Sequence, residues 1–170
     1  MATRYTRITT DLGELTLVAE GAELVGVYFP HHWTRPSQAG FGPAVDVEAD
    51  PVLLQARREL EDYLAGRRTS FDVPTRAAGD DFQRQVWALL TQIPYGETTT
   101  YGALAQELGN PALAQQVGQA VGHNPLSIIV PCHRVVGADG SLTGYAGGLP
   151  RKAFLLELEE PAEVTAARLF

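Results

Sequence analysis

Cysteine is almost absent from this 170-residue chain, which contains only Cys132. A single cysteine cannot form an internal disulfide, and this is typical of a protein from a reducing compartment. No apolar run approaches the length of a membrane span. The first residues, Met-Ala-Thr-Arg-Tyr, lack the apolar core of a signal peptide. We therefore expect a cytoplasmic protein with no membrane partner.

Positive charge is also scarce, because the formal net charge is −7 and the sequence pI is about 5.0. Lysine occurs once, as Lys152, against 12 arginines. Strong nonspecific binding to nucleic acid favours a basic surface that neutralises phosphates. Any binding to DNA must therefore depend on a local surface and not on the overall charge.

Hydrophobic residues make up 45% of the chain, which is enough for a real core. Three alternating segments at 4–9, 14–19 and 23–29, separated by turn residues, predict a small antiparallel sheet. An amphipathic helix is predicted at 51–65, where Gly66 ends it. The segment 30–51 between sheet and helix contains four prolines and no clear period, so it is predicted to be a long loop.

The composition of 73–80 is that of a linker, and we place a boundary there between domains 1–79 and 80–170. In the second domain, Asp80 or Asp81 can cap a helix at 82–93. Shorter helices follow at 101–108 and 111–122, joined only by Gly109-Asn110, which matches a helix-turn-helix. An ordinary helix pair in a small bundle has the same spacing. The fold class is α+β, with a sheet-plus-helix domain followed by a mainly helical one.

The last of these helices contains small residues, including Ala114 and Gly118, and has no charged residue. Small residues let a helix backbone come close to another surface, either a partner helix or a nucleic-acid groove. An exposed helix without charge is unusual and favours one of these two contacts.

Cys132 follows an apolar β-branched run and precedes His133 and Arg134, while Asn124 lies just upstream. A nucleophilic thiol needs a nearby base or cation that favours the thiolate. On an extended segment neighbouring side chains point to opposite sides, so His133 need not touch Cys132 directly, and a water could relay the proton. A lone cysteine in an apolar run is more often a packing residue than a nucleophile.

Five motifs make residues 82–159 resemble the catalytic domain of the O6-alkylguanine-DNA alkyltransferases. The Pro-Cys-His-Arg-Val core is the most specific of them, and the full set is FQRQVW at 82–87, IPYGETTTYGALA at 93–105, GNP at 109–111, VGQAVGHNPLSIIVPCHRVVGADGSLTGYAGGL at 117–149 and RKAFLLELE at 151–159. The resemblance implies a ribonuclease-H-like first domain and a winged-helix-like second domain.

The resemblance also implies a suicide reaction in DNA repair. Cys132 would take the alkyl group from O6-alkylguanine, and from O4-alkylthymine, in double-stranded DNA after the base has been flipped out. The S-alkylcysteine is not regenerated, so each molecule would act once. No cofactor is implied, and we expect a monomer without an obligate protein partner.

By matching position, the resemblance assigns catalytic roles around Cys132. His133 would accept the thiol proton through a water, Glu159 would orient His133, and Asn124 would hold the turn that faces the cysteine. The pocket for the flipped base would be formed by Tyr101, which donates to O6 as it leaves, and by Val135, Tyr145 and Ala146.

DNA contacts are implied for the second helix of the helix-turn-helix, which would enter the minor groove. The predicted contact residues are Ala114, Gln115, Gln116 and Gly118, together with Arg134.

Gln115 departs from the family pattern, which has an arginine there that fills the space left by the flipped base. Glutamine is shorter and uncharged. Three interpretations stay open: Gln115 does this work more weakly, another residue fills the gap, or the protein prefers a different DNA context. Trp33 and Arg35 in the long loop are candidates to compensate, although Trp33 can instead anchor the loop to the core.

No metal site is predicted. A structural zinc in part of the family needs cysteines in the first domain, and His31 and His32 alone are too few. Three other functions compete with alkyl transfer: a non-catalytic lesion binder, a transcriptional sensor of alkylation, and a redox or hydrolytic cysteine enzyme. The intact Pro-Cys-His-Arg motif disfavours the lesion binder. The lack of a regulatory domain disfavours the transcriptional sensor, and the lack of a resolving cysteine disfavours the redox or hydrolytic enzyme.

Overall fold

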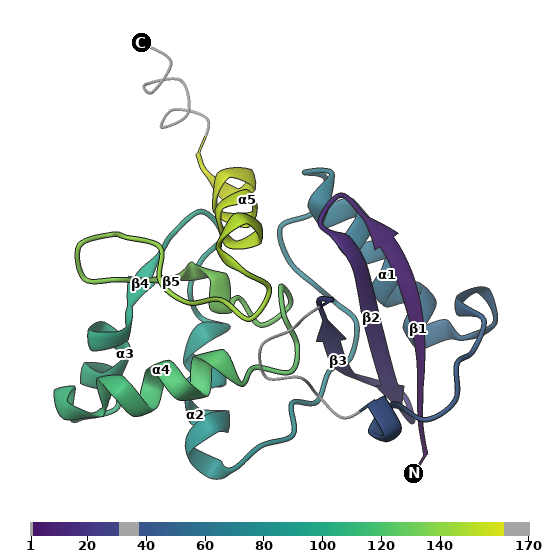
Figure 1. Ribbon diagram of the computed structural model, residues 1–170, viewed down its shortest axis with the longest axis horizontal. Helices are drawn as coiled ribbons and strands as arrows, with labels where there is room; N and C mark the ends of the chain where they lie inside the picture. Colours follow the sequence, from purple (N-terminus) through teal and green to yellow (C-terminus); the bar gives the residue numbers. More distant parts are fainter. Residues whose placement is uncertain (1, 31–37, 162–170) are drawn as a thin grey trace.

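The computed structural model of the chain describes residues 2–30 and 38–161. These residues form two halves. One half is a sheet backed by a helix, and the other is a group of shorter helices whose last member, α5 (Leu149–Glu159), lies beside the first half (Figure 1).

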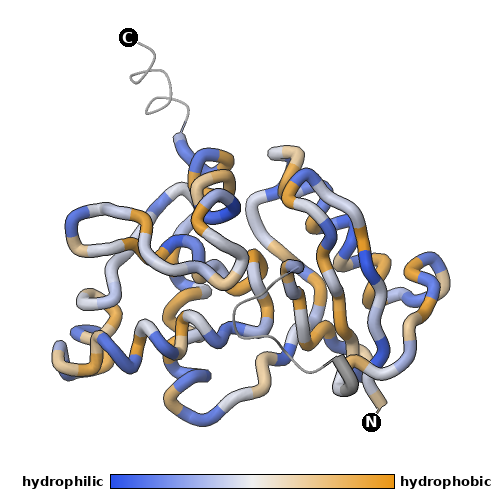
Figure 2. The backbone as a smooth tube through the Cα atoms, in the orientation of Figure 1, coloured by the Kyte–Doolittle hydropathy of each residue, from blue (hydrophilic) through white to orange (hydrophobic). Residues whose placement is uncertain are grey.

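The sheet contains β1 (Thr3–Thr10), β2 (Gly13–Glu20) and β3 (Glu23–Tyr28), in that order. Both pairings are antiparallel, as predicted. The register between β2 and β3 shifts between Val18 and Ala19, where β3 contains one extra residue, Val25. Alternation along β2 places Leu15 and Leu17 on the fully buried face. Figure 2 shows this change between apolar and polar residues along the strands.

Helix α1 (Pro51–Leu64) covers the buried face of the sheet. Its first turn is capped by Asp50, whose carboxylate accepts from the N–H groups of Val52 and Leu53 at 3.1 Å. The predicted helix is confirmed and ends one residue early, ahead of Gly66 with its φ of +79°. The preceding segment 38–50 contains two single 3-10 turns, Gln38–Phe41 and Val47–Ala49.

The second half is mainly helical, and a short parallel pair of strands that sequence patterns did not indicate lies beside its helices. In chain order the elements are α2 (Asp81–Leu90), β4 (Thr99–Thr100), α3 (Tyr101–Glu107), α4 (Ala114–Gly122), β5 (Val135–Val136) and α5 (Leu149–Glu159). Asp80 caps α2 in a reciprocal capping box with Gln83. The predicted end of this helix at 93 is wrong, because the chain tightens into a turn before Pro94 and α2 stops at Leu90.

Helices α3 and α4 form the predicted helix pair. Gly109, with a φ of +94°, ends the first helix, and Asn110 caps the next turn by accepting from the Ala112 N–H at 3.0 Å. That turn, Pro111–Leu113, is 3-10 and not α-helical, so α4 begins at Ala114. The indole N–H of Trp87 in α2 donates to the Ala120 carbonyl at 2.8 Å and fixes α4 against α2.

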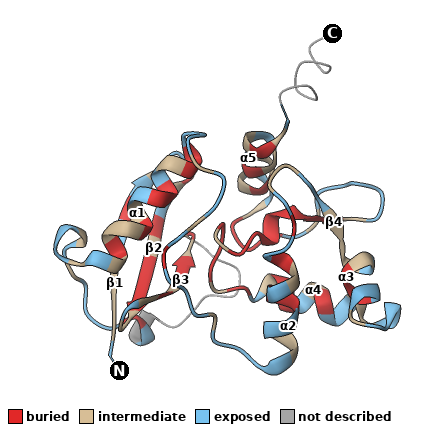
Figure 3. Cartoon of the chain, turned by 180° about the vertical axis from the view of Figure 1, so that it is seen from behind, coloured by how far each residue is buried: buried red, intermediate tan, exposed pale blue. Residues whose placement is uncertain are grey.

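The two halves are joined by backbone as well as by side chains. The Val27 N–H in β3 donates to the Pro125 carbonyl at 2.8 Å, so the segment before Cys132 lies along the edge of the sheet. Arg151 in α5 donates to the Leu12 carbonyl at 2.7 Å. Figure 3 shows buried residues in both halves and in the segment that leads to β5. Within the described residues, no helix is long and apolar enough to cross a membrane.

Candidate active site

Cys132 begins a single 3-10 turn, Cys132–Arg134, that leads into β5. The extended conformation expected here is therefore wrong. In a 3-10 turn successive side chains are about 120° apart, and all three side chains of this turn are buried. The thiol-bearing residue is only 4% exposed.

The environment of the thiol both opposes and favours its ionisation. Burial raises the pKa of Cys132, whereas a hydrogen bond with Asn124 and the charge of Lys152 lower it, with a smaller contribution from Tyr145. The net direction is upward, so the resting cysteine keeps its proton at neutral pH. A reaction at this sulfur therefore needs a base.

Asn124 holds the turn that precedes the cysteine. Its amide N–H donates to the Val130 carbonyl at 2.8 Å, and its amide oxygen accepts from the Leu126 N–H at 2.9 Å. Within this turn Ile128 has a φ of +73°, which is strained for a β-branched residue. Asn124 thus stabilises a strained turn directly before the reactive position.

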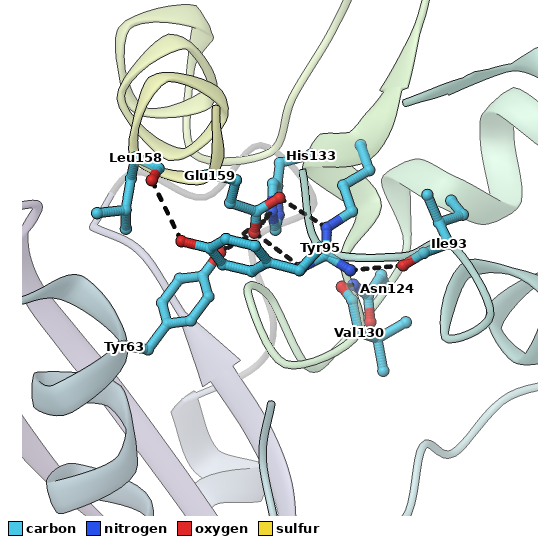
Figure 4. A network of polar contacts seen from close by, with 9 residues as sticks. Tyr63, Ile93, Tyr95, Asn124, Val130, His133, Leu158 and Glu159 are labelled. Carbon is cyan, nitrogen blue, oxygen red and sulfur yellow. Dashed lines mark hydrogen bonds and ion pairs between the residues drawn. The ribbon is translucent and has the colours of Figure 1, made fainter. Parts of the chain in front are cut away.

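His133 and Glu159 form the candidate base. The His133 Nε2 lies 2.8 Å from the Glu159 Oε2 (Figure 4). Burial raises the pKa of Glu159, but hydrogen bonds from His133 and Arg134 outweigh it and lower this pKa to about 2. An ionised carboxylate only accepts, so Nε2 carries the proton and Nδ1 is the basic nitrogen.

The Nδ1 atom of His133 is buried and has no hydrogen-bond partner among the described residues. Burial is also the main reason that the pKa of His133 is lowered, so the imidazole is neutral at rest. The residue beside the cysteine is therefore a neutral imidazole with an unoccupied acceptor nitrogen.

The structure contradicts the DNA contact predicted for Arg134. Its Nε and Nη2 donate to the two oxygens of Glu159 at 2.7 and 2.8 Å, and its Nη1 donates to the Ile93 carbonyl at 2.6 Å. The guanidinium also lies over the Tyr95 ring, 5.7 Å from its centroid. The side chain is buried and each of its three nitrogens donates a hydrogen bond, so it stabilises the carboxylate inside the protein.

Lys152 is a buried charged residue near Cys132 that the sequence did not indicate as part of the site. It is fully buried, and its ammonium donates to the carbonyls of Val135 and Thr143 at 2.6 and 2.7 Å. Burial lowers the pKa of this lysine to about 8, against the opposing effect of Cys132. The available signal was its rarity, since it is the only lysine of the chain.

An open hollow of about 900 Å³ lies between α4 and the loop before Tyr145. It brings together four residues predicted for the base pocket and the DNA surface: Tyr101, Ala114, Gln115 and Gly118. The Tyr101 hydroxyl accepts from the Thr143 hydroxyl at 3.1 Å.

Two further lining residues, Gln119 and His123, were missed. Helical spacing from Gln115 indicates both, because residues four apart share a face.

The other predicted residues lie outside this hollow. Gln116 is exposed on α4, whereas Val135, Tyr145 and Ala146 are buried. The Tyr145 ring packs edge-on against Phe29 of the first half, with centroids 5.7 Å apart. Trp33 and Arg35 lie outside the described residues. Within residues 2–30 and 38–161, no three His, Cys, Asp or Glu side chains could together hold a metal ion.

A helix pair with helix-turn-helix spacing, beside a buried cysteine and a histidine–carboxylate pair, is the arrangement expected of a DNA-binding protein with a cysteine nucleophile. Two family models support this class and extend it. The 6-O-methylguanine DNA methyltransferase DNA binding domain matches residues 81–161, and the ribonuclease-like domain of the same proteins matches residues 3–77. The chain belongs to the O6-methylguanine DNA methyltransferase family.

Relatives and solved structures agree with this assignment. A methylated-DNA–protein-cysteine methyltransferase of Mycobacterium tuberculosis is 46% identical over 172 residues, covering 95% of this chain and 96% of the relative. The crystal structure of Mycobacterium tuberculosis OGT in complex with DNA superposes with a TM-score of 0.82 at 44% identity, covering 95% of this chain and 98% of that one. The relative from Methanosarcina acetivorans is 54% identical over 113 residues, which is 66% of this chain and 72% of the relative.

Proposed function

We propose that this protein repairs DNA directly, by moving the alkyl group of O6-alkylguanine in duplex DNA onto its own Cys132. Family membership supports alkyl transfer, and the DNA-bound relative supports DNA as the partner. The observation that carries the proposal is the neutral His133 that follows the buried Cys132, whose Nε2 is paired to Glu159, which leaves Nδ1 as its basic nitrogen.

The atoms of the reaction balance without a cofactor. The Cys132 sulfur forms a bond to the alkyl carbon as the bond from that carbon to guanine O6 breaks, and the electron pair stays on O6. The thiol proton passes through a water to the His133 Nδ1 and later returns to the guanine through solvent. The product is a thioether, which lacks a good leaving group, so each chain acts once.

Tyr101 stabilises the leaving oxygen. Because its hydroxyl accepts from Thr143, its own proton is free to point elsewhere. A hydrogen bond from Tyr101 to O6 becomes stronger as negative charge develops there. Val135, Tyr145 and Ala146 frame the base beside the thiol.

Base flipping follows from the burial of the thiol, because an alkylated base inside a duplex stack cannot reach it. The uncharged helix α4 would lie in the minor groove, with Ala114 and Gly118 at the closest approach and Gln116 at the backbone. Gln115 would fill the space that the base leaves, assisted by Trp33 and Arg35. O4-alkylthymine is a second substrate, and the protein acts as a cytoplasmic monomer.

The decisive experiment is an intact-mass measurement after incubation with duplex DNA that contains one O6-methylguanine. We expect each chain to gain one methyl group, with restored guanine in equal amount, and Cys132→Ser to gain none. A duplex with O4-methylthymine tests the second substrate in the same way. Tight lesion binding by the wild-type protein without any gain in mass would contradict transfer and favour a lesion-binding role.

A further inference from the structure

The carboxylate of Glu159 has a donor from the opposite half of the molecule. Tyr63, near the end of α1, is fully buried, and its hydroxyl donates to the Glu159 Oε2 (Figure 4). The same hydroxyl lies 3.5 Å from the His133 Nε2. A residue of the ribonuclease-like domain therefore contacts the base that serves Cys132.

Aromatic neighbours fix the direction of the Tyr63 hydroxyl. The Tyr63 ring packs against Phe71, with centroids 5.2 Å apart, and edge-on against Tyr95, with centroids 6.1 Å apart. A ring held on two sides can turn little, so its hydroxyl stays directed at the carboxylate.

His133 and Arg134 compete for this carboxylate. Arg134 binds both oxygens of Glu159, whereas His133 binds only Oε2. The positive charge of Arg134 also opposes a second positive charge on His133. Tyr63 differs from Arg134 because it is a neutral donor: it holds Oε2 near His133 without adding charge.

We infer that Tyr63 is a positioning residue for alkyl transfer, which keeps the Glu159 Oε2 aligned with the His133 Nε2 while His133 takes the thiol proton. The inference rests on the proposed function. Without the hydroxyl, Arg134 draws the carboxylate away and the imidazolium is less well stabilised. The thiolate then forms mainly by ordinary ionisation, which requires a higher pH.

Single-turnover kinetics of Tyr63→Phe test this, using the full chain in excess over duplex DNA with O6-methylguanine. The first-order rate constant is expected to be about 10-fold to 100-fold lower near neutral pH. This is less than the roughly 100-fold to 10,000-fold that a general base contributes, because His133 and Glu159 both remain. The deficit should shrink as the pH rises, and the Kd for the same DNA should be unchanged. At a protein concentration that saturates the DNA, the rate constant, unlike an amplitude, does not depend on the folded fraction.

Two further variants make the result specific. Tyr95→Phe also removes a hydroxyl near the domain junction, one that donates to the Leu158 carbonyl at 3.2 Å, and it should keep the wild-type pH profile. Tyr63→Met removes the same hydroxyl and replaces the ring with a flexible side chain, so it should show the same alkaline shift as Tyr63→Phe. It provides the test if Tyr63→Phe folds poorly.

The possible outcomes separate the two proposals. A wild-type rate constant and pH profile in either folded Tyr63 variant overturns the inference, and so does a loss that is equal at every pH. Failure of the wild-type protein to accept a methyl group instead overturns the proposed function.

Discussion

Arg134, Lys152 and Glu159 carry charge inside the protein, whereas α4, which lines an open hollow, has no charged residue. We call Arg134, Lys152 and Glu159 the interior cluster, and burial alone would disfavour charge on these residues. The exposed helix, which we propose contacts a polyanion, is where positive charge would be expected.

The contrast shows that the two regions depend on different interactions: the buried residues depend on charge, and α4 depends on shape. In a buried site a fixed charge is little screened, and its desolvation is offset because each charged group here is hydrogen-bonded. A helix in a narrow groove depends on fit, for which Ala114 and Gly118 are suited. Since the chain carries a net charge of −7, binding to DNA must then depend on a local fit.

The largest effect is expected when the interior cluster loses its central charge, in Glu159→Gln. Arg134 would keep its burial and lose its anionic partner, which costs about 3–5 kcal/mol when a buried pair is broken. Denaturant unfolding measures the loss. Glu157→Gln, on the exposed face of the same helix, is the matched control and should change the free energy of unfolding little.

Acid should produce a related loss in the wild-type protein. The pKa of Glu159 lies at about 2, below its ordinary value of 4.5, so its carboxylate stabilises the fold fully above pH 4.5 and progressively less as the pH falls towards 2. The stability difference between wild type and Glu159→Gln should therefore narrow over this window. A constant difference from neutral pH to pH 2 would contradict the role given to this carboxylate.

A smaller effect is expected when charge is added to the exposed helix, in Gln115→Arg. We expect higher affinity for DNA and a steeper salt dependence, by about one in the slope of log K against log salt. Gln116→Arg adds the same charge outside the hollow. If Gln115→Arg leaves affinity unchanged, the missing cation does not limit binding; if both variants behave alike, position in the hollow is irrelevant.

The smallest effect on the fold is expected from Gly118→Ala. The added Cβ would lie 3.7 Å from the Tyr101 ring, an ordinary contact, so a gain of about 0.5–1 kcal/mol from helix propensity should appear in thermal unfolding. Affinity for DNA should fall nevertheless, because the extra methyl group holds the groove away. Unchanged affinity would mean that α4 does not approach DNA closely at this position.

Much of the fold was predictable because its signals are local. The alternation in β1 to β3, the Asp50 and Asp80 caps and the glycine that ends α3 all act within a few residues of chain. The predicted end of α2 was wrong because the turn before Pro94 ends the helix at Leu90, although the residues that follow have helical propensity. The strands β4 and β5 are two residues each, and their partners lie 36 positions apart, so no local pattern indicates them.

The candidate site was predictable in its members and not in its arrangement. The motifs around Cys132 indicated His133, Asn124 and Glu159. In the structure His133 pairs with Glu159, and Asn124 holds the turn before Cys132. Arginine is a residue type that often contacts DNA. Only the ion pair with Glu159 shows that the guanidinium of Arg134 points into the protein.

The sequence by itself determined which side chain is the nucleophile candidate, which helices pair, and that α4 carries no charge, because these properties belong to residue types and short spacings. Tertiary structure decided which charges are buried together. Tyr63 and Glu159 are 96 positions apart, and Lys152 reaches Val135 across 17. Such contacts exist only after the two domains pack, because burial is a property of the packed surfaces and not of any single segment.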